Sequence, residues 1–222
     1  MVNTPNHLGK SKRLLEPIER ISEVLFGLIM VLTYTTALTV GKDEGEAMHT
    51  MLMGALGCNL AWGIIDAVLY LMGCMAAKAK GLITLRTVRN TTDTQEAQRL
   101  IADALPQALT AILQPAELES MHQRLKQLPE PPKRVHLRKD DWLGALAVFL
   151  WVFIITFPVT IPFMFMHHAA PALLVSNGIA IVLLFGLGYA YGHCTMRNPL
   201  LKGIVMVIVG AAMVALCKAF GG

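Results

Sequence analysis

The stretch NLAWGIIDAVLYLMG, residues 59–73, is apolar over almost its whole length but carries an aspartate, Asp66, near its centre. It lies inside a longer apolar run, Met51 to Ala76. A bilayer core needs about 20 mainly apolar residues per helix, so this run predicts a membrane-spanning helix. A carboxylate at the centre of such a helix costs about 2.5–3.5 kcal/mol and usually faces the interior of a helix bundle. Asp66 is therefore the first candidate functional residue.

The composition of the whole chain agrees with a membrane location. Of its 222 residues, 55% are hydrophobic and only 15% are charged, whereas average soluble domains carry about 25% charged residues. The N-terminal 20 residues are too polar for a signal peptide, so the first apolar run is expected to stay in the membrane. The four cysteines form no CxxC pair, and no disulfide framework is predicted.

Five apolar runs are long enough to cross a bilayer. They cover Ile21–Val40, Met51–Ala76, Trp142–Met166, Ala172–Gly192 and Leu200–Phe220. We therefore predict an all-α, polytopic membrane protein with five transmembrane helices and a helical cytoplasmic insert between helices two and three. The expected organisation is an N-terminal cytoplasmic segment (1–20), transmembrane helices one and two (21–76), the insert (77–140) and transmembrane helices three to five (141–222).

The distribution of lysine and arginine predicts the orientation. Basic residues precede the first run, are frequent in the long insert and recur as Arg197 and Lys202 between runs four and five. The segments GKDEGEAMH and HHAAP, which join the other runs, hold a single lysine between them. We expect the N-terminus and the insert inside, and the C-terminus outside. The net charge of +4 then reflects membrane topology, and no nucleic-acid partner is predicted.

The insert has the pattern of short helices joined by prolines. Thr92 or Asp93 can cap a first helix, Pro106 should kink or split it, and Pro115 is a good first residue for a second. The apolar faces of these helices need a partner. That partner could be each other, the membrane surface or a second subunit.

Polar residues recur at helical spacing on the first two runs, which predicts that each set shares one face. The second run carries Asn59, Gly63, Asp66 and Tyr70, and the first carries Glu23, Gly27, Met30 and Tyr34. Two acidic residues on neighbouring helices, with a thioether and phenols nearby, could form a path for cations. Hard cations take carboxylate oxygens and softer transition metals accept sulfur. A carboxylate that can be protonated could also couple metal movement to protons.

Each of these residues also has a structural interpretation. Glu23 could lie at the inner interface in contact with water or Arg20, and Asp66 could be a protonated residue hydrogen-bonded to a neighbouring helix. Asn59 often joins transmembrane helices, while Met30 and Tyr34 could serve packing alone.

Other features point less directly to a site. The segments MHTMLM (48–53) and MFMHH (164–168) combine methionine and histidine on the predicted outer side, and both residue types can bind copper or other transition metals. Pro158 and Pro162 should kink or unwind the third run, and the pattern Gly188 to Gly192 suits close helix packing or a dimer. No phosphate loop, HExxH or haem motif occurs, so we do not expect an enzyme or a tightly bound cofactor.

The order of these features resembles the vacuolar iron transporter family, whose members are also called VIT1/CCC1-like. The resemblance is carried by SEVLFGLIMVL (22–32), GCNLAWGIIDA (57–67), DWLGALAVFLWVFIITFPVTIP (141–162) and the closing GIVMVIVGAAMVALCKAFGG (203–222). It implies a homodimer of a divergent bacterial type that moves ferrous iron, or a similar divalent metal such as manganese, out of the cytoplasm in exchange for protons. Glu23 would be the carboxylate on the path.

The chain departs from this family pattern in two places. The insert has only four glutamates, Glu96, Glu117, Glu119 and Glu130, so the glutamate-rich cytoplasmic metal store of typical members is not expected. Asp66 also stands where a serine is common, beside Ala67 near the usual methionine. We predict a metal site from Glu23, Asp66, Asn59, Met30 and Tyr34. The alternatives are a non-transporting scaffold or accessory subunit, or a lipid-handling protein with a lateral groove between its spans.

Overall fold

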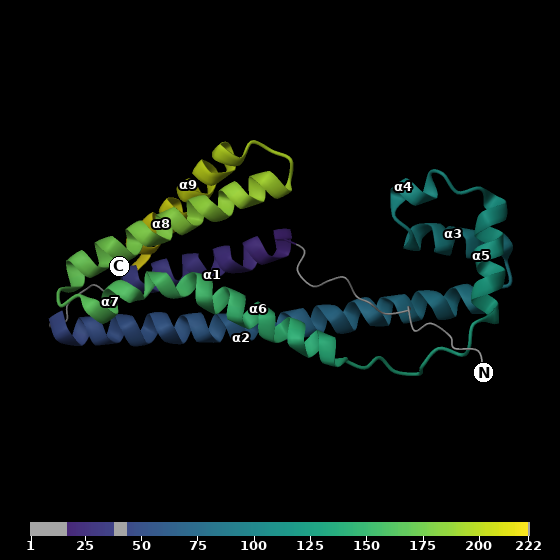
Figure 1. The fold of residues 1–222 in the computed structure, drawn as a ribbon, viewed down its shortest axis with the longest axis horizontal. Coiled ribbons are helices and arrows are strands. Elements are labelled where there is room, and N and C mark those ends of the chain that lie inside the picture. Colours follow the sequence, from purple (N-terminus) through teal and green to yellow (C-terminus); the bar gives the residue numbers. More distant parts are fainter. Residues whose placement is uncertain (1–16, 38–43, 222) are drawn as a thin grey trace. The chain divides into compact units, whose positions relative to one another are not determined.

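The computed structural model describes residues 17–37 and 44–221, with side chains over 21–32, 49–216 and at 219. Within these ranges the chain is helical and contains no strand (Figure 1). The elements are α1 (Pro17–Ala37), α2 (Glu44–Asn90), α3 (Thr94–Ala104), α4 (Gln107–Thr110), α5 (Pro115–Gln127), α6 (Lys139–Thr156), the 3-10 turn η1 (Phe157–Val159), α7 (Ile161–Phe165), α8 (Ala169–Cys194) and α9 (Pro199–Gly221). The described residues form two compact units, one of those up to residue 68 together with those from residue 143, and one of residues 69–142.

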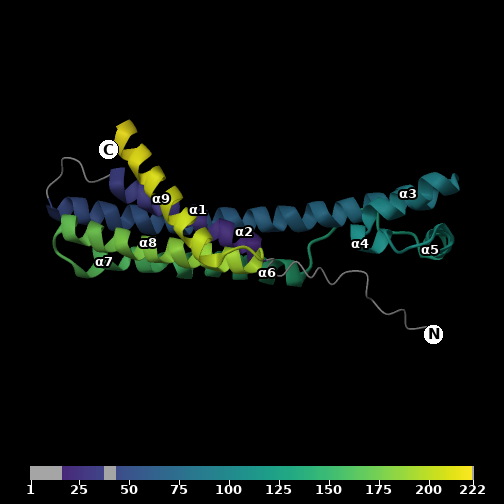
Figure 2. The same ribbon diagram turned by 90° about the horizontal axis from the view of Figure 1, so that it is seen from above.

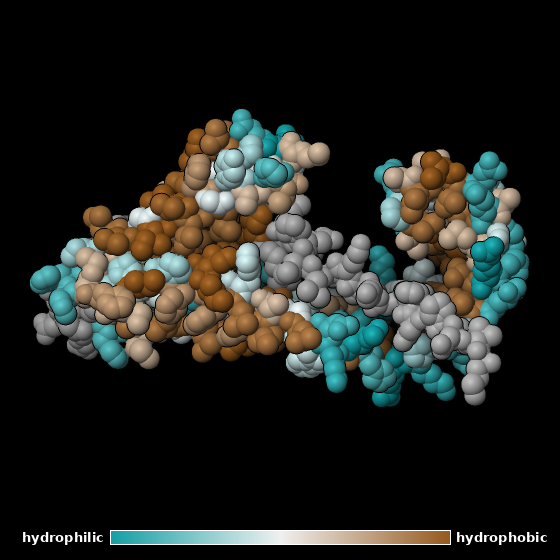
Figure 3. Space-filling model, in the orientation of Figure 1, coloured by the Kyte–Doolittle hydropathy of each residue, from teal (hydrophilic) through white to brown (hydrophobic). Residues whose placement is uncertain are grey.

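Four helices are long and apolar enough to cross a membrane: His49–Asn90, Lys139–Val159, Ala169–Cys194 and Pro199–Leu216. The described apolar part of α1, Ile21–Leu32, is shorter. Large apolar side chains stay exposed on these helices, among them Leu174 and Val182 of α8, and apolar residues cover much of the visible face of the first unit (Figure 3). Such a surface fits lipid rather than water. The chain is therefore a multi-pass membrane protein, and a fifth crossing by α1 stays a prediction.

Small residues let α8 and α9 pack closely within the first unit, where α9 runs at an angle to α8 (Figure 2). A Cβ atom added to Gly188 would lie 2.5 Å from the carbonyl oxygen of Lys202, and one added to Gly203 would lie 2.7 Å from the ring of Phe185. The small-residue pattern that suggested helix packing or a dimer is thus used inside the chain. α1 packs against both helices, and its Val24, Leu28 and Val31 lie in the core.

The two prolines of the third apolar run break the helix, as predicted. α6 ends at Thr156, Pro158 lies in the turn η1, and Pro162 lies in the first turn of α7. The hydroxyl of Ser176 in α8 donates to the carbonyl oxygen of Val159 at 2.7 Å. A hydroxyl from a neighbouring helix therefore satisfies backbone that the break leaves without a helical partner.

The second unit is built on the C-terminal part of α2, from Leu69 onward, which includes the end of the predicted span. Asp93 caps α3, and α5 begins at Pro115, which confirms both predicted helix starts. α3 and α5 pack against each other, and the buried His122 of α5 lies with Nε2 3.0 Å from the carbonyl oxygen of Val88 in α2. The helices of the insert therefore pack against each other, which is one of the three partners predicted for their apolar faces.

Charged side chains bond both ends of the segment that joins α5 to α6 to the C-terminal part of α2. The guanidinium of Arg89 donates to the carbonyl oxygen of Pro129 at 2.7 Å. At the start of α6, the carboxylate of Asp141 accepts a hydrogen bond from the backbone N–H of Arg138 and pairs with the ammonium of Lys78. Asp141, the third residue of α6, therefore closes the first turn of this helix with its side chain.

Candidate functional site

The predicted acidic residues lie where α1, α2 and α6 meet in the first unit, and two glycines bring these helices close. A Cβ atom added to Gly27 of α1 would lie 3.2 Å from Cγ2 of Thr156 and 3.2 Å from Cδ1 of Trp62. One added to Gly63 of α2 would lie 2.9 Å from the ring of Phe149. All three distances are shorter than ordinary van der Waals contact, so a larger residue at either position would require the neighbouring side chains to shift.

Asn59 joins α2 to α6 through its side-chain amide. Its Nδ2 donates to the carbonyl oxygen of Phe153 at 3.2 Å, and its Oδ1 accepts a hydrogen bond from the hydroxyl of Thr156. Asn59 and Thr156 are both buried. This arrangement corresponds to the structural interpretation of Asn59 as a residue that joins helices. A cation at Oδ1 would share this oxygen with the Thr156 hydroxyl.

Trp62 joins α2 to α1. Its indole Nε1 donates to the backbone carbonyl oxygen of Glu23 at 3.0 Å, and its ring lies 5.9 Å, between centroids, from the ring of Phe26. The bond uses the backbone of Glu23 and leaves the carboxyl group out of it. Trp62 therefore fixes the position of Glu23 along α2 without depending on the charge of that residue.

Asp66 is almost completely buried, with 2% of its surface exposed. It shares one face of α2 with the buried Asn59 and Gly63, as the spacing predicted, and Tyr70 on the same face is half-buried. Asp66 lies four residues beyond Trp62, which is about 6 Å along the helix. Asp66 therefore lies about one helical turn along α2 from the residue that bonds the backbone of Glu23.

The other predicted ligands are described to different extents. Met30 of α1 is half-buried, as is Glu23. Tyr34 belongs to α1, but its side chain lies outside the described residues. Among the described side chains, no group of three or more His, Cys, Asp or Glu residues lies together. A cation at this place would therefore take oxygens from two carboxylates and complete its shell with other groups.

The methionine and histidine segments meet in part. Met51 is fully buried in a small apolar cluster with Phe163 and Ala172, and Met166 packs against the same cluster. The remaining residues with described side chains, His49, Met53, Met164, His167 and His168, are exposed, and the side chain of Met48 lies outside the described residues. The structure thus brings one methionine of each segment together in an apolar environment.

Two residues at this contact were missed by the sequence analysis, Trp62 and Thr156. Trp62 stands one helical turn before Asp66 in an apolar run, and Thr156 directly precedes the proline-containing turn. A tryptophan inside a span, away from the interfaces where this residue is enriched, is the signal that could have marked the first. No comparable signal marks Thr156.

Comparison with known proteins bears on the insert and on the helices that follow it. The model of the VIT family matches residues 84–221, which is more than half of the chain. None of the curated proteins compared with the chain matches it. The match includes α6, α8 and α9 but begins after Asp66, so it supports the fold independently of the acidic pair. Together with the membrane-spanning helices, it shows that the chain belongs to the VIT family, whose members are membrane ion transporters rather than enzymes.

Proposed function

We propose that the chain transports divalent metal cations, iron or manganese, out of the cytoplasm in exchange for protons and acts as a homodimer. In this proposal the metal, Fe²⁺ or Mn²⁺, is the substrate, and no tightly bound cofactor is needed. The protein would lie in a bacterial inner (plasma) membrane, with its N-terminus in the cytoplasm and its C-terminus outside. The excess of lysine and arginine before the first span and in the insert supports this orientation.

The observation that carries the proposal is the burial of Asp66 in a membrane-spanning helix, about one helical turn from Trp62, whose indole bonds the backbone of Glu23. Ionisable residues inside a membrane protein are costly and typically mark ion pathways. In a chain that belongs to a transporter family, a pair of carboxyl groups on two neighbouring helices is best explained as a place where the cation is desolvated and bound.

The proposed roles follow from the chemistry of the side chains. Glu23 and Asp66 supply carboxylate oxygens, which suit Mn²⁺ and Fe²⁺. Met30 of α1 would offer a thioether that favours transition metals over magnesium or calcium, and Asn59 and Tyr34 would be further oxygen ligands. A carboxyl group must lose its proton before it binds a cation. Metal binding would therefore release protons, which is a physical basis for exchange of metal against protons.

Metal flux into proteoliposomes tests the proposal, with iron, manganese, cobalt and zinc outside and a pH-sensitive dye inside. The wild type should move at least one metal with opposing proton movement. Glu23→Gln and Asp66→Asn should each abolish flux, because both changes remove the charge and keep the shape of the side chain. Glu23→Gln also leaves the Trp62 hydrogen bond in place, since that bond is made to the backbone.

The matched control is Glu130→Gln, because Glu130 is an exposed acid of the insert and its loss should leave flux unchanged. Folded wild-type protein that moves none of the four metals would contradict the proposal. The scaffold interpretation would then regain support, and partners of the insert would be the next target. Equal loss of flux in Glu130→Gln would instead mean that surface charge, and not the buried pair, limits transport.

A further inference from the structure

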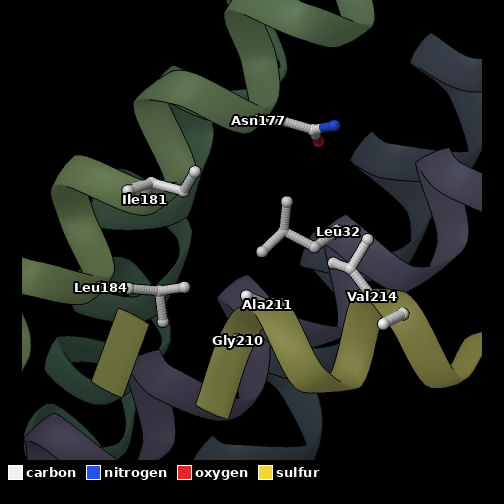
Figure 4. A pocket seen from close by; sticks show the side chains of 8 residues that line it. Leu32, Asn177, Ile181, Leu184, Gly210, Ala211 and Val214 are labelled. Atoms are coloured by element: carbon white, nitrogen blue, oxygen red, sulfur yellow. The ribbon is translucent and has the colours of Figure 1, made fainter. Parts of the chain in front are cut away.

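A pocket of about 290 Å³ lies between α1, α8 and α9 in the first unit (Figure 4). Its lining is apolar except for one carboxamide, and consists of Leu32, Asn177, Ile181, Leu184, Gly210, Ala211, Val214 and Ala215. Gly210, Ala211 and Ala215 leave space on the α9 side that larger residues would fill. A Cβ atom added to Gly210 would lie 2.4 Å from Cδ1 of Leu184, so even one methyl group would reshape this wall.

Asn177 is the polar member of this lining. Its Oδ1 is inaccessible to solvent, and no donor reaches it from the residues that the structure describes. The side chain points from α8 into the space beside Leu32 (Figure 4). A buried carbonyl oxygen without a hydrogen bond is costly and is normally satisfied by protein, water or ligand. The pocket therefore has an apolar body and one acceptor that needs a donor.

The depth of Asn177 in the membrane narrows the class of donor. Asn177 is eight residues after the start of α8, which is about 12 Å along a helix of about 39 Å. With a hydrocarbon core about 30 Å thick, Asn177 lies inside the core near one boundary, and Leu184 and Gly210 lie deeper. An amphiphile entering from that boundary would place its polar end at Asn177 and its chain along α8 and α9.

We propose that this pocket binds a lipid alcohol, meaning a hydrocarbon chain whose hydroxyl group donates to Oδ1 of Asn177. At about 30 Å³ per small group, the volume accommodates roughly ten chain atoms, the size of one alkyl segment. The acyl chains of phospholipids carry no donor at this depth, and no charged side chain lines the pocket to attract a metal ion. The site is separate from the acidic pair and would bind its ligand whether or not the protein carries metal.

Photolabelling of the full chain in lipid nanodiscs tests the proposal. The probe is an octanol that carries a diazirine, and labelled residues are mapped by mass spectrometry. Labels are expected on α8 and α9 at the pocket. Excess 1-octanol should suppress them, and octane should compete about three- to tenfold less well, because it lacks the one hydrogen bond. Equal competition by octane would overturn the proposal, since water rather than a ligand hydroxyl would then satisfy Asn177.

Two variants and a control test the hydrogen bond to Asn177 separately from the volume of the pocket. Asn177→Leu should remove the preference for octanol over octane, and Ala211→Leu should fill the pocket and abolish specific labelling. Val182→Leu, at an exposed position of α8, should label as the wild type does. Unchanged labelling of folded Ala211→Leu would refute the pocket as the site. Disulfide cross-linking of two copies through Val214→Cys would also refute the proposal, because a second copy would then cover the pocket.

Discussion

The contact between α8 and α9 gives the sharpest test of the fold, through Gly188→Ala. The added Cβ atom would lie 2.5 Å from the carbonyl oxygen of Lys202 and 2.8 Å from Cα of Gly203. Both are backbone atoms, so no side-chain rotation relieves the clash. Gly186, two residues away on the same helix, has nothing within 4 Å of the corresponding position. Gly186→Ala is therefore a control with the same chemical change and no clash.

The magnitude follows from these distances. Restoring ordinary carbon contacts requires the helices to separate locally by roughly 1 Å, which forfeits up to about half of the dispersion energy of the contacts involved. Overpacking of this kind costs about 1–3 kcal/mol. Replacing glycine by alanine in a helix also contributes up to about 1 kcal/mol of favourable helix propensity. That contribution is common to both variants, so the difference between them isolates the cost of the clash.

Thermal unfolding of the detergent-solubilised protein, followed by tryptophan fluorescence, measures this difference. For a chain of this length, 1 kcal/mol shifts the unfolding midpoint by about 2–4 °C. Gly188→Ala should therefore unfold about 2–12 °C below Gly186→Ala, and Gly186→Ala should match or exceed the wild type. Equal midpoints for the two variants would refute the packing of α8 against α9 at Gly188, and with it the use of this glycine inside one chain.

Two further substitutions test polar contacts in the two units. Lys78→Met removes the partner of the buried Asp141 carboxylate and should lower stability by about 1–3 kcal/mol. The double variant, which adds Asp141→Asn, should recover part of the lost unfolding midpoint. A further drop in the midpoint would argue against the ion pair. Asn59→Leu removes two hydrogen bonds to α6 and should lower stability by about 1–2 kcal/mol in the same assay. Metal flux through folded Asn59→Leu should fall, because the proposal also makes Asn59 an oxygen ligand, and unchanged flux would leave Asn59 with the structural role alone.

Helical periodicity and local chain chemistry account for the parts of the structure that the sequence predicted. The shared face of Asn59, Gly63 and Asp66 follows from spacing alone, because residues three and four apart lie together on any helix. The cap at Asp93 and the start of α5 at Pro115 depend only on neighbouring backbone groups. The break at Pro158 follows from the missing backbone donor of proline.

Contacts between distant segments set the features that the sequence left open. The predicted span ended at Ala76, where the apolar residues end, but α2 continues to Asn90. The C-terminal part of α2 makes hydrogen bonds to the segment that follows α5, such as the bond from Arg89 to Pro129. Hydropathy does not predict contacts of this kind. In the same way, the spacing of Gly188 and Gly192 predicted a close partner without showing whether that partner was α9 or a second copy.

A transport role and a structural role for Asp66 predict different effects of its substitution. In the first unit, the hydrogen bonds of Trp62 and Asn59 tie α2 to α1 and α6 through uncharged side chains. A buried carboxyl group that costs about 2.5–3.5 kcal/mol takes a large share of a typical margin of about 5–15 kcal/mol. If Asp66 serves transport, Asp66→Asn should abolish flux while the unfolding midpoint stays equal or rises, because the charge is removed and the shape is kept. If Asp66 is held for structure, the same change should lower the midpoint, and flux should fall only as far as the folded fraction does.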